Sequence, residues 1–336
     1  MADTTTPPEK KTVIVYKRPL APDLMAQLEQ RFTVLDFTGV TDLAEEADFL
    51  EALPRAHGLI GASVKLDREL LARAERLEAI SSISVGVDNY DIAYLNERDI
   101  VLCHTPDVLT ETTADTAFLL ILSAARRGVE LANMVRKGEW TESVKEPQFG
   151  VDVHHKTLGI VGMGRIGQAI GRRAKFGFGM TVNYHNRSRH EVVEQELDAT
   201  WLEFETLLER SDIVCVTVPL SDATRKMFDQ KAFEAMGAEC IFVNISRGGV
   251  VDEPALIEAL QNGTIRAAGL DVFETEPLSA DSPLTRLDNA VTLPHIGSAT
   301  HETRFAMAEL AVQNLIQSLQ GDRPQAPYNW DALDRG

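Results

Sequence analysis

An arginine, a glutamate and a histidine each follow an apolar run in the second half of the chain, and together they could reduce a carbonyl group. They are Arg247, Glu276 and His295. A histidine can donate a proton near neutral pH, and a carboxylate beside it would stabilise the imidazolium. An arginine can clamp a substrate carboxylate and polarise the neighbouring carbonyl. Taken singly, each residue has an ordinary structural explanation, but the set predicts reduction of a 2-oxo acid with His295 as the proton donor.

A glycine-rich turn between an expected strand and an expected helix predicts a dinucleotide site. The turn runs from Gly162 through Gly164 to Gly167, after the apolar run 158–161 and before a helix expected to reach residue 176. The first glycine permits a tight turn, the second lets the backbone approach a pyrophosphate, and the third allows close helix packing. Free N–H groups at the helix start, where Arg165 and Ile166 lie, would face the phosphates.

The residues after the next expected strand indicate which nicotinamide cofactor is used. An NAD site usually has an acidic residue there, which binds the ribose 2′-OH. This chain has Asn186, Arg187, Ser188 and Arg189 instead. Two arginines suit a 2′-phosphate through charge-assisted hydrogen bonds, although a solvated basic loop is the alternative explanation. We therefore expect NADP(H) as the cofactor, with weaker use of NAD(H).

The elements that must position these residues are strands alternating with helical patterns, an order that predicts parallel sheets joined by right-handed crossovers. The fold class expected is α/β, with two Rossmann-like or flavodoxin-like domains. Ligands of such sheets bind outside the carboxyl ends of the strands, so the three candidate catalytic residues should converge there. Strands are expected at residues 13–16, 34–37, 58–61, 79–84 and 100–103, and then at 158–161, 180–184, 213–218, 241–245, 268–272 and 291–293.

The two halves of the pattern predict two domains with the active site in the cleft between them. Residues 1–105 with 300–336 are expected to form a discontinuous substrate-binding domain, because a helix expected over 302–319 would pack back on the first sheet. Residues 106–299 are expected to form the dinucleotide-binding domain. The helix expected over 112–126 is apolar on nearly every face, which predicts burial between two bodies.

Composition excludes several classes of function. The chain has 336 residues and a formal net charge of −18, which argues against nucleic acid or an anionic membrane surface as a partner. Its three cysteines form no CxxC pair, and neighbouring His154 and His155 cannot easily share one ion, so no metal site is expected. The N-terminus lacks the apolar core of a signal peptide. We expect a cytoplasmic protein.

Longer runs resemble one enzyme family over nearly the whole chain. The glycine turn, Ser246-Arg247-Gly248, Asp271-Val272-Phe273 with Glu276-Pro277, and Pro294-His295-Ile296-Gly297 resemble the D-isomer-specific 2-hydroxyacid dehydrogenases. The runs 82–89, 138–140 and 294–304 are most similar to the branch of glyoxylate/hydroxypyruvate reductases, also called 2-ketogluconate reductases.

The resemblance implies roles for individual residues. Arg247 would bind substrate, His295 would be the acid/base with Glu276 as its partner, and the backbone N–H groups of Val85 and Gly86 would hold the substrate carboxylate. Trp140 would reach the active site of a partner subunit, which implies a homodimer. Gly248 and Gly249 would leave a looser loop after the arginine, and residues near Ser63 and Lys65 would shape the far end of the substrate site. Further cofactor contacts are expected at Pro219, Ile245, Ser246, Asp271 and Gly297.

Three functions remain open at this point. The first is an NADPH-dependent reductase of glyoxylate, hydroxypyruvate or 2-ketogluconate, which gives the D-2-hydroxy acid. The second is an NAD-dependent relative such as a phosphoglycerate dehydrogenase, against which Arg187 and Arg189 argue. The third is a nucleotide-sensing corepressor or scaffold that has no need of turnover. Intact Arg247, Glu276 and His295 favour an enzyme.

Overall fold

The computed structural model describes residues 10–62 and 64–333. These residues form two compact units. The first unit contains the described residues up to Leu109 together with those from Thr300 onward, and the second unit contains Thr110–Ala299. Ser63, for which a place near the substrate was expected, lies outside the described residues.

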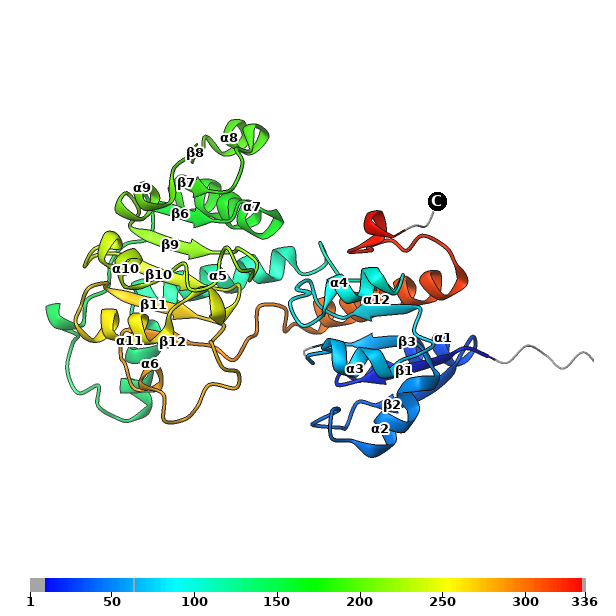
Figure 1. Ribbon diagram of the computed structural model, residues 1–336. Coiled ribbons are helices and arrows are strands. Elements are labelled where there is room, and N and C mark those ends of the chain that lie inside the picture. Colours follow the sequence, from blue (N-terminus) through cyan, green and yellow to red (C-terminus); the bar gives the residue numbers. More distant parts are fainter. Residues whose placement is uncertain (1–9, 63, 334–336) are drawn as a thin grey trace, which may run out of the picture. The chain divides into compact units, whose positions relative to one another are not determined.

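The sheet of the first unit has five parallel strands in the order β2-β1-β3-β4-β5 (Figure 1). This is the flavodoxin-like order, in which the strand order reverses between β1 and β3. The strands are rich in β-branched and aliphatic residues, and β1, β4 and β5 are almost wholly buried, as expected for a parallel sheet covered on both faces. They are β1 (Thr12–Tyr16), β2 (Thr33–Phe37), β3 (Ala56–Gly61), β4 (Ala79–Ser82) and β5 (Val101–Cys103).

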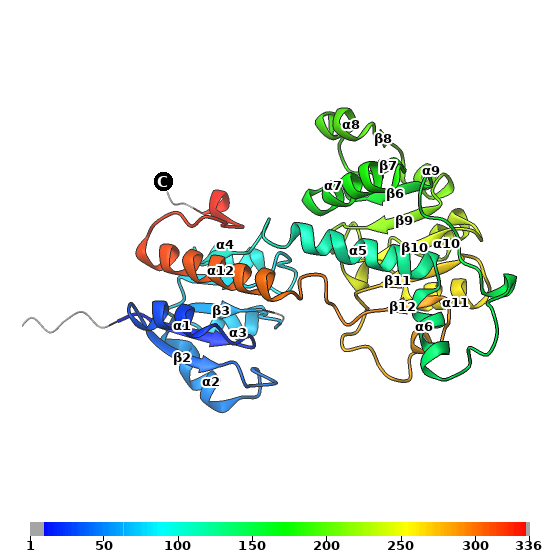
Figure 2. The ribbon, with the colours of Figure 1, turned by 180° about the vertical axis from the view of Figure 1, so that it is seen from behind.

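Two short helices of the first unit begin at aspartate caps. The side chain of Asp67 caps α3 by accepting from Leu70 N, and Asp91 caps α4 by accepting from Tyr94 N. The long C-terminal helix α12 lies along β3, β4 and β5, as Figure 2 shows from behind. The helices are α1 (Pro22–Glu29), α2 (Ala47–Ala52), α3 (Arg68–Arg73), α4 (Ile92–Glu97) and α12 (His301–Gln320).

The segment after α12 completes the first unit along β5. The Asn329 side chain accepts a hydrogen bond from Leu102 N at 2.7 Å and donates to Ile100 O at 3.0 Å. Tyr328 N also donates to Leu102 O, at 2.7 Å. The outer edge of β5 is therefore paired rather than open to other strands.

The second unit is built on a seven-stranded parallel sheet in the order β12-β11-β10-β9-β6-β7-β8. From β6 outward this is the Rossmann order, with the reversal between β6 and β9. The glycine-rich turn directly follows β6, at that reversal. The strands are β6 (Thr157–Val161), β7 (Thr181–His185), β8 (Thr200–Trp201), β9 (Ile213–Val216), β10 (Ile241–Asn244), β11 (Ala267–Leu270) and β12 (Ala290–Thr292).

The apolar helix α5 packs against β10, β11 and α7 of this unit. Leu119 and Leu122 on it are 48% and 36% exposed, and the burial of this helix between two bodies stays a prediction. The helix buries one face, and its apolar composition extends beyond that face. The helices of the unit are α5 (Thr110–Ala125), α6 (Gly128–Arg136), α7 (Arg165–Arg172), α8 (Glu191–Leu197), α9 (Phe204–Glu209), α10 (Gln230–Met236) and α11 (Glu253–Gln261).

The predicted fold class, two α/β units with parallel sheets, is confirmed. The ends of the expected strands differ from the observed ones by a few residues, and the two-residue strand β8 has no counterpart among the predictions because it is too short for a pattern. The helix after the glycine turn ends sooner than expected, because a π-helical turn takes over at Arg173–Gly177. Within the described residues, no helix combines the length and apolar character needed to cross a membrane. The cytoplasmic location stays a prediction.

Candidate active site

Two of the three candidate catalytic side chains are hydrogen-bonded to each other. His295 follows β12 and Glu276 lies in the loop after β11, and Nδ1 of the histidine is 2.8 Å from Oε2 of the glutamate. The other oxygen, Oε1, accepts from the backbone N–H of Phe273 at 3.1 Å. Both glutamate oxygens are thus engaged, which fixes the orientation of the imidazole.

The charges around Glu276 favour its ionised form. Burial alone would raise the pKa of this carboxyl group. The hydrogen bond from His295, the histidine charge, the Phe273 N–H and the charge of Arg247 outweigh burial and hold the pKa below its ordinary value. Arg247 is therefore close enough to act on the carboxylate, and the second unit brings the three candidates to one edge of its sheet.

A buried aspartate holds the loop that carries the histidine. Asp271 is 1% exposed, and its two oxygens accept from Ile296 N and Gly297 N, each at 2.7 Å. Burial raises the pKa of Asp271, and the hydrogen bonds from the two N–H groups offset only part of this rise. His295 itself has φ = 54°, a left-handed conformation that is costly for a residue with a side chain. Asp271 thus fixes the two residues that follow a strained position.

Arg247 is positioned by a residue that the sequence analysis did not identify. The side chain of Asn244, at the end of β10 and 1% exposed, accepts from Ser246 N at 3.0 Å and from Ser246 Oγ at 2.9 Å. Its Nδ2 donates to Arg247 O at 3.0 Å. One buried amide therefore shapes the whole turn. The sequence signal for this role was the polar Asn244 at the end of the otherwise apolar strand Ile241–Asn244.

The two glycines after the arginine do not form a looser loop, so that expectation is wrong. Gly248 is buried and begins the 3-10 turn Gly248–Val250. A Cβ at Gly248 would lie 1.8 Å from the carbonyl carbon of Phe273. Glycine is needed here because the backbone after β10 touches the backbone after β11, which keeps the Arg247 and Glu276 loops together.

The glycine turn after β6 has the geometry that a dinucleotide needs. Gly162 has φ = 104°, and the Thr217 hydroxyl donates to its carbonyl oxygen. A Cβ at Gly167 would lie 2.2 Å from Gly162 O, so the first turn of α7 sits directly on the loop. A Cβ at Gly164 would meet no atom within 4 Å, which leaves room beside the exposed backbone at the N-terminus of α7. Arg165 and Ile166 are the first two residues of that helix.

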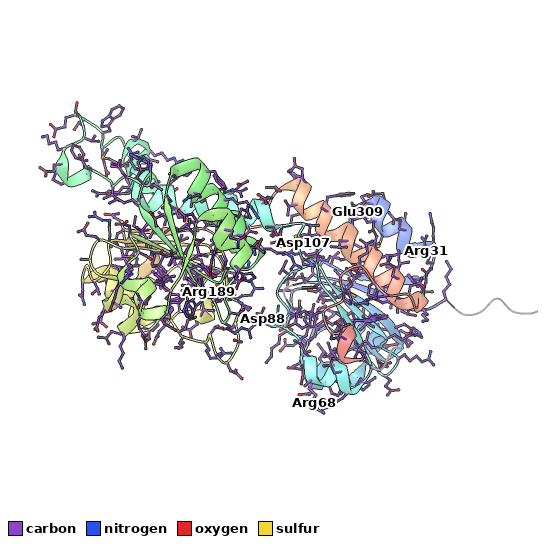
Figure 3. All side chains as sticks on the ribbon, turned by 90° about the horizontal axis from the view of Figure 1, so that it is seen from above. Arg31, Arg68, Asp88, Asp107, Arg189 and Glu309 are labelled. Atoms are coloured by element: carbon purple, nitrogen blue, oxygen red, sulfur yellow. The ribbon has the colours of Figure 1, made fainter. Side chains whose placement is uncertain are left out.

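The loop after β7 contains an ion pair that the sequence analysis did not foresee. Arg189, which is labelled in Figure 3, donates from Nε and Nη2 to the two oxygens of Glu194, at 3.0 and 2.5 Å. The hydrogen bonds from Arg189 and from the Tyr184 hydroxyl lower the pKa of Glu194 to about 2. Arg187 is exposed and forms no ion pair with any described residue. Both arginines were expected to bind a 2′-phosphate, but Arg189 is paired with a carboxylate of the chain and Arg187 has no ion pair among the described residues.

The remaining predicted residues lie on both units. In the second unit Ile245 is buried, with 7% of it exposed, whereas Trp140 is 61% exposed. The N–H of Gly297 donates to Asp271, and the Pro219 carbonyl accepts from the Thr224 hydroxyl. Asn186 and Ser188 lie in the loop after β7, where the Asn186 side chain donates to Ser188 O. Val85, Gly86 and Lys65 are in the first unit. Among described residues, no partner accepts a hydrogen bond from the N–H of Val85 or Gly86.

Comparison with known proteins identifies the family. A sequence model described as "D-isomer specific 2-hydroxyacid dehydrogenase, NAD binding domain" matches residues 118–297. The chain belongs to the D-isomer-specific 2-hydroxyacid dehydrogenases. It is 53% identical over 315 residues to a protein of Klebsiella pneumoniae named glyoxylate/hydroxypyruvate reductase B, covering 93% of this chain and 96% of that protein. A Serratia proteamaculans protein of the same name is 53% identical over 312 residues, which are 93% of this chain and 95% of that one.

Solved structures of proteins with similar sequences have the same fold. A Thermus thermophilus protein is 41% identical with a TM-score of 0.86, over 94% of this chain and 99% of that one. An NADPH-dependent glyoxylate/hydroxypyruvate reductase of Sinorhizobium meliloti, in complex with NADP and malonate, is 33% identical with a TM-score of 0.85, over 95% and 97% of the two chains. The resemblance to this family of oxidoreductases, and to its glyoxylate/hydroxypyruvate reductase branch, is confirmed.

Replacing Glu276 by Gln should remove a pH-dependent contribution to stability. Since the pKa of Glu276 is lower in the folded chain, its contribution is fully present above an unfolded pKa of about 4.3 and is lost as pH falls through the folded pKa. The carboxylate is 36% exposed, so the wild type should lose only about 0.2–1 kcal/mol relative to Glu276→Gln between about pH 5 and pH 3. Urea unfolding of both proteins over this range measures the difference, and parallel curves would contradict the assignment.

Proposed function

We propose that the protein reduces small 2-oxo acids to D-2-hydroxy acids with NADPH, and that His295 donates the proton. The observation that carries this proposal is the His295–Glu276 hydrogen bond, with Arg247 beside it, on a sheet edge that also has a dinucleotide turn. Relatives named glyoxylate/hydroxypyruvate reductase support glyoxylate and hydroxypyruvate as candidate substrates, and 2-ketogluconate is a third candidate from the sequence resemblance alone.

The side chains divide the chemistry in a simple way. Glu276 holds Nδ1 of His295, so Nε2 is the atom that would deliver a proton to the carbonyl oxygen. The planar guanidinium of Arg247 would bind the substrate carboxylate in two places and draw electron density from the carbonyl. The bound reduced nicotinamide supplies the hydride. Gly162, Gly164 and the N-terminus of α7 would hold its pyrophosphate, with Ile245, Ser246, Pro219, Asp271 and Gly297 as further contacts.

The two units would have separate tasks. We assign dinucleotide binding to the second unit, whose sheet has the Rossmann order, and substrate binding to the first. The N–H groups of Val85 and Gly86, which no described residue uses, support the second assignment because a substrate carboxylate could accept from both.

Replacing His295 by Ala should lower kcat by about 10²–10⁴-fold, the usual worth of general acid catalysis. The affinity for NADPH should stay nearly unchanged, since the glycine turn is untouched. Steady-state rates with glyoxylate and fluorescence titration with NADPH measure the two effects. His154→Ala, at an exposed histidine of the same unit, is the control. Wild-type turnover by His295→Ala would remove the histidine from the mechanism.

The preference for NADPH rests on the loop after β7. The chain has no acidic residue at Asn186, and the exposed Arg187 is available for a 2′-phosphate. Arg189 already pairs with Glu194, so we assign Arg187 the larger share of the selectivity. The NADP complex of the Sinorhizobium meliloti relative supports this choice of cofactor.

Arg187→Ala should lower the NADPH/NADH ratio of kcat/KM by about 10–100-fold, the worth of one charge-assisted hydrogen bond to phosphate. Arg189→Ala should have a smaller effect. Adding Asn186→Asp to Arg187→Ala should lower the ratio further, because the carboxylate repels a 2′-phosphate and accepts from a ribose 2′-OH. Arg210→Ala, at an exposed arginine of the same unit, is the control. An unchanged ratio in the Arg187 variants would overturn the assignment.

A homodimer is the assembly that the surface supports. No residue of α6 is buried, and Val129, Val135, Trp140, Val144 and Phe149 on α6 and the segment after it are 41–61% exposed. This segment lies at the periphery of the second unit (Figures 1 and 2). An apolar surface of this kind is typical of a subunit interface.

Val135→Asp should shift the protein from dimer toward a 37.0 kDa monomer, because it places a charge in the proposed interface. Val192→Asp makes the same change at a valine that is 77% exposed on α8, and it should leave the dimer intact. Light scattering after gel filtration distinguishes the two. A monomeric wild type would contradict the proposal.

One assay tests the function as a whole. Initial rates with NADPH and with NADH are measured against glyoxylate, hydroxypyruvate and 2-ketogluconate. Turnover with NADPH is expected, whereas a preference for NADH would favour the NAD-dependent alternative. Tight nucleotide binding without turnover of any acid would overturn the enzyme proposal in favour of a sensor.

A further inference from the structure

A cavity in the first unit, at the end of the sheet where the strands begin, is surrounded by positive charge. Its volume is about 260 Å³. The charged residues around it are Lys10, Arg55 and Arg76, and no carboxylate of a described residue lines it, although acidic residues outnumber Lys and Arg by 51 to 33 in the chain. A cavity whose walls carry one sign of charge focuses the electric field and attracts small ions of the opposite sign. The remaining lining residues are Thr12, Thr33, Leu35 and His57.

The register of the sheet brings these residues together. Thr12, the first residue of β1, is opposite Thr33 of β2 and Ala56 of β3, and the three strands are neighbours in the sheet (Figure 1). Arg55 directly precedes β3, and Arg76 lies three residues before β4. Since all of these strands are parallel, the cavity lies at the opposite end of the sheet from the loop that we assigned to the substrate carboxylate.

Two of the three cations have no counter-charge in the described part of the chain. Arg55 and Arg76 are exposed, and neither side chain forms an ion pair or a hydrogen bond with a described residue. Glu78, two residues after Arg76, is already paired with Lys11 at 2.5 Å. Like charges around one cavity repel each other, so a bound anion would stabilise this part of the unit.

The other lining residues add hydrogen-bond donors. Lys10 Nζ is held by two backbone carbonyls at the C-terminal end of α1, at 3.0 and 3.3 Å, and not by a carboxylate. Nδ1 of His57 accepts from Thr12 N at 3.1 Å, so the neutral ring carries its proton on Nε2. Thr12 and Thr33 each have a hydroxyl group. Guanidinium, ammonium and hydroxyl donors are the groups with which proteins bind phosphate.

We propose that this cavity binds a small anion that carries phosphate. Arg55 and Arg76 would donate to the phosphate oxygens, and Lys10 would add charge. A phosphate group carries more than one negative charge near neutral pH, which suits three cations better than a single carboxylate does. The size of the cavity fits a small molecule, whereas the net charge of −18 repels large polyanions. The proposal does not depend on the proposed function, because binding is measured without turnover.

Calorimetric titration with inorganic pyrophosphate tests the site. The oxidised nicotinamide nucleotide is kept in excess so that the glycine turn is occupied, and the buffer contains about 0.15 M salt to screen general surface attraction. The wild type should bind pyrophosphate, and Arg55→Gln and Arg76→Gln should each raise its Kd by about 10–100-fold, the worth of one charge-assisted hydrogen bond. Arg55→Lys should restore part of the loss. Citrate should bind more weakly, and equal binding of citrate would overturn the choice of phosphate.

The controls separate this site from a surface effect and from the candidate active site. Arg73→Gln removes the same charge from an exposed arginine of the same unit that does not line the cavity, and it should leave the Kd unchanged. Arg247→Gln, in the second unit, should also leave it unchanged. An equal loss in Arg73→Gln, a loss confined to Arg247→Gln, or no binding by the wild type would overturn the proposal.

The melting temperature without pyrophosphate provides a second readout. Arg55→Gln and Arg76→Gln should melt no lower than the wild type, because no described residue pairs with either side chain and each substitution removes a repelling charge. Pyrophosphate should raise the melting temperature of the wild type more than that of either variant. A lower melting temperature of the variants without pyrophosphate would show that the arginines are structural, and it would overturn the proposal.

Discussion

The Asp271 carboxylate, at the end of β11, accepts hydrogen bonds from the backbone that follows β12. Removing a carboxylate from water is costly, and two short bonds to N–H groups offset that cost only if the loop keeps one shape. The loop shape in turn sets the left-handed backbone of His295 and the direction of its imidazole toward Glu276. The geometry of the candidate site therefore depends on an acid whose two oxygens bind the backbone after His295.

Packing between neighbouring loops supplies the second constraint. Gly248 brings the backbone after β10 onto the backbone at Phe273, and the Phe273 N–H also donates to Glu276. Asn244 holds the turn that carries Arg247. Since these residues follow the adjacent strands β10 and β11, the contact between their backbones couples the position of Arg247 to that of Glu276.

Local sequence patterns were enough to predict the strands, the glycine turn and the sheet edge at which the candidate residues meet. They failed where a contact depends on three-dimensional neighbours. The pairing of Arg189 with Glu194 requires the course of the loop before α8, which no periodicity reveals. The role of Gly248 was misjudged because glycine serves both loose loops and tight backbone contacts, and only the position of Phe273 distinguishes the two. The exposed leucines of α5 show the same limit, because an apolar composition does not say which faces are covered.

The discontinuity of the first unit has a consequence for synthesis on the ribosome. Leu315 and Leu319 of α12 pack on Gly58, and Ser81 donates to Ala311 O, so residues near the C-terminus cover strands made near the start. Between them the ribosome must translate all of residues 110–299. At roughly 5–20 residues per second, this takes on the order of 10–40 s. During that interval the nascent chain carries an uncovered apolar sheet face, which is the kind of surface that chaperones bind. The unit that begins first is completed last.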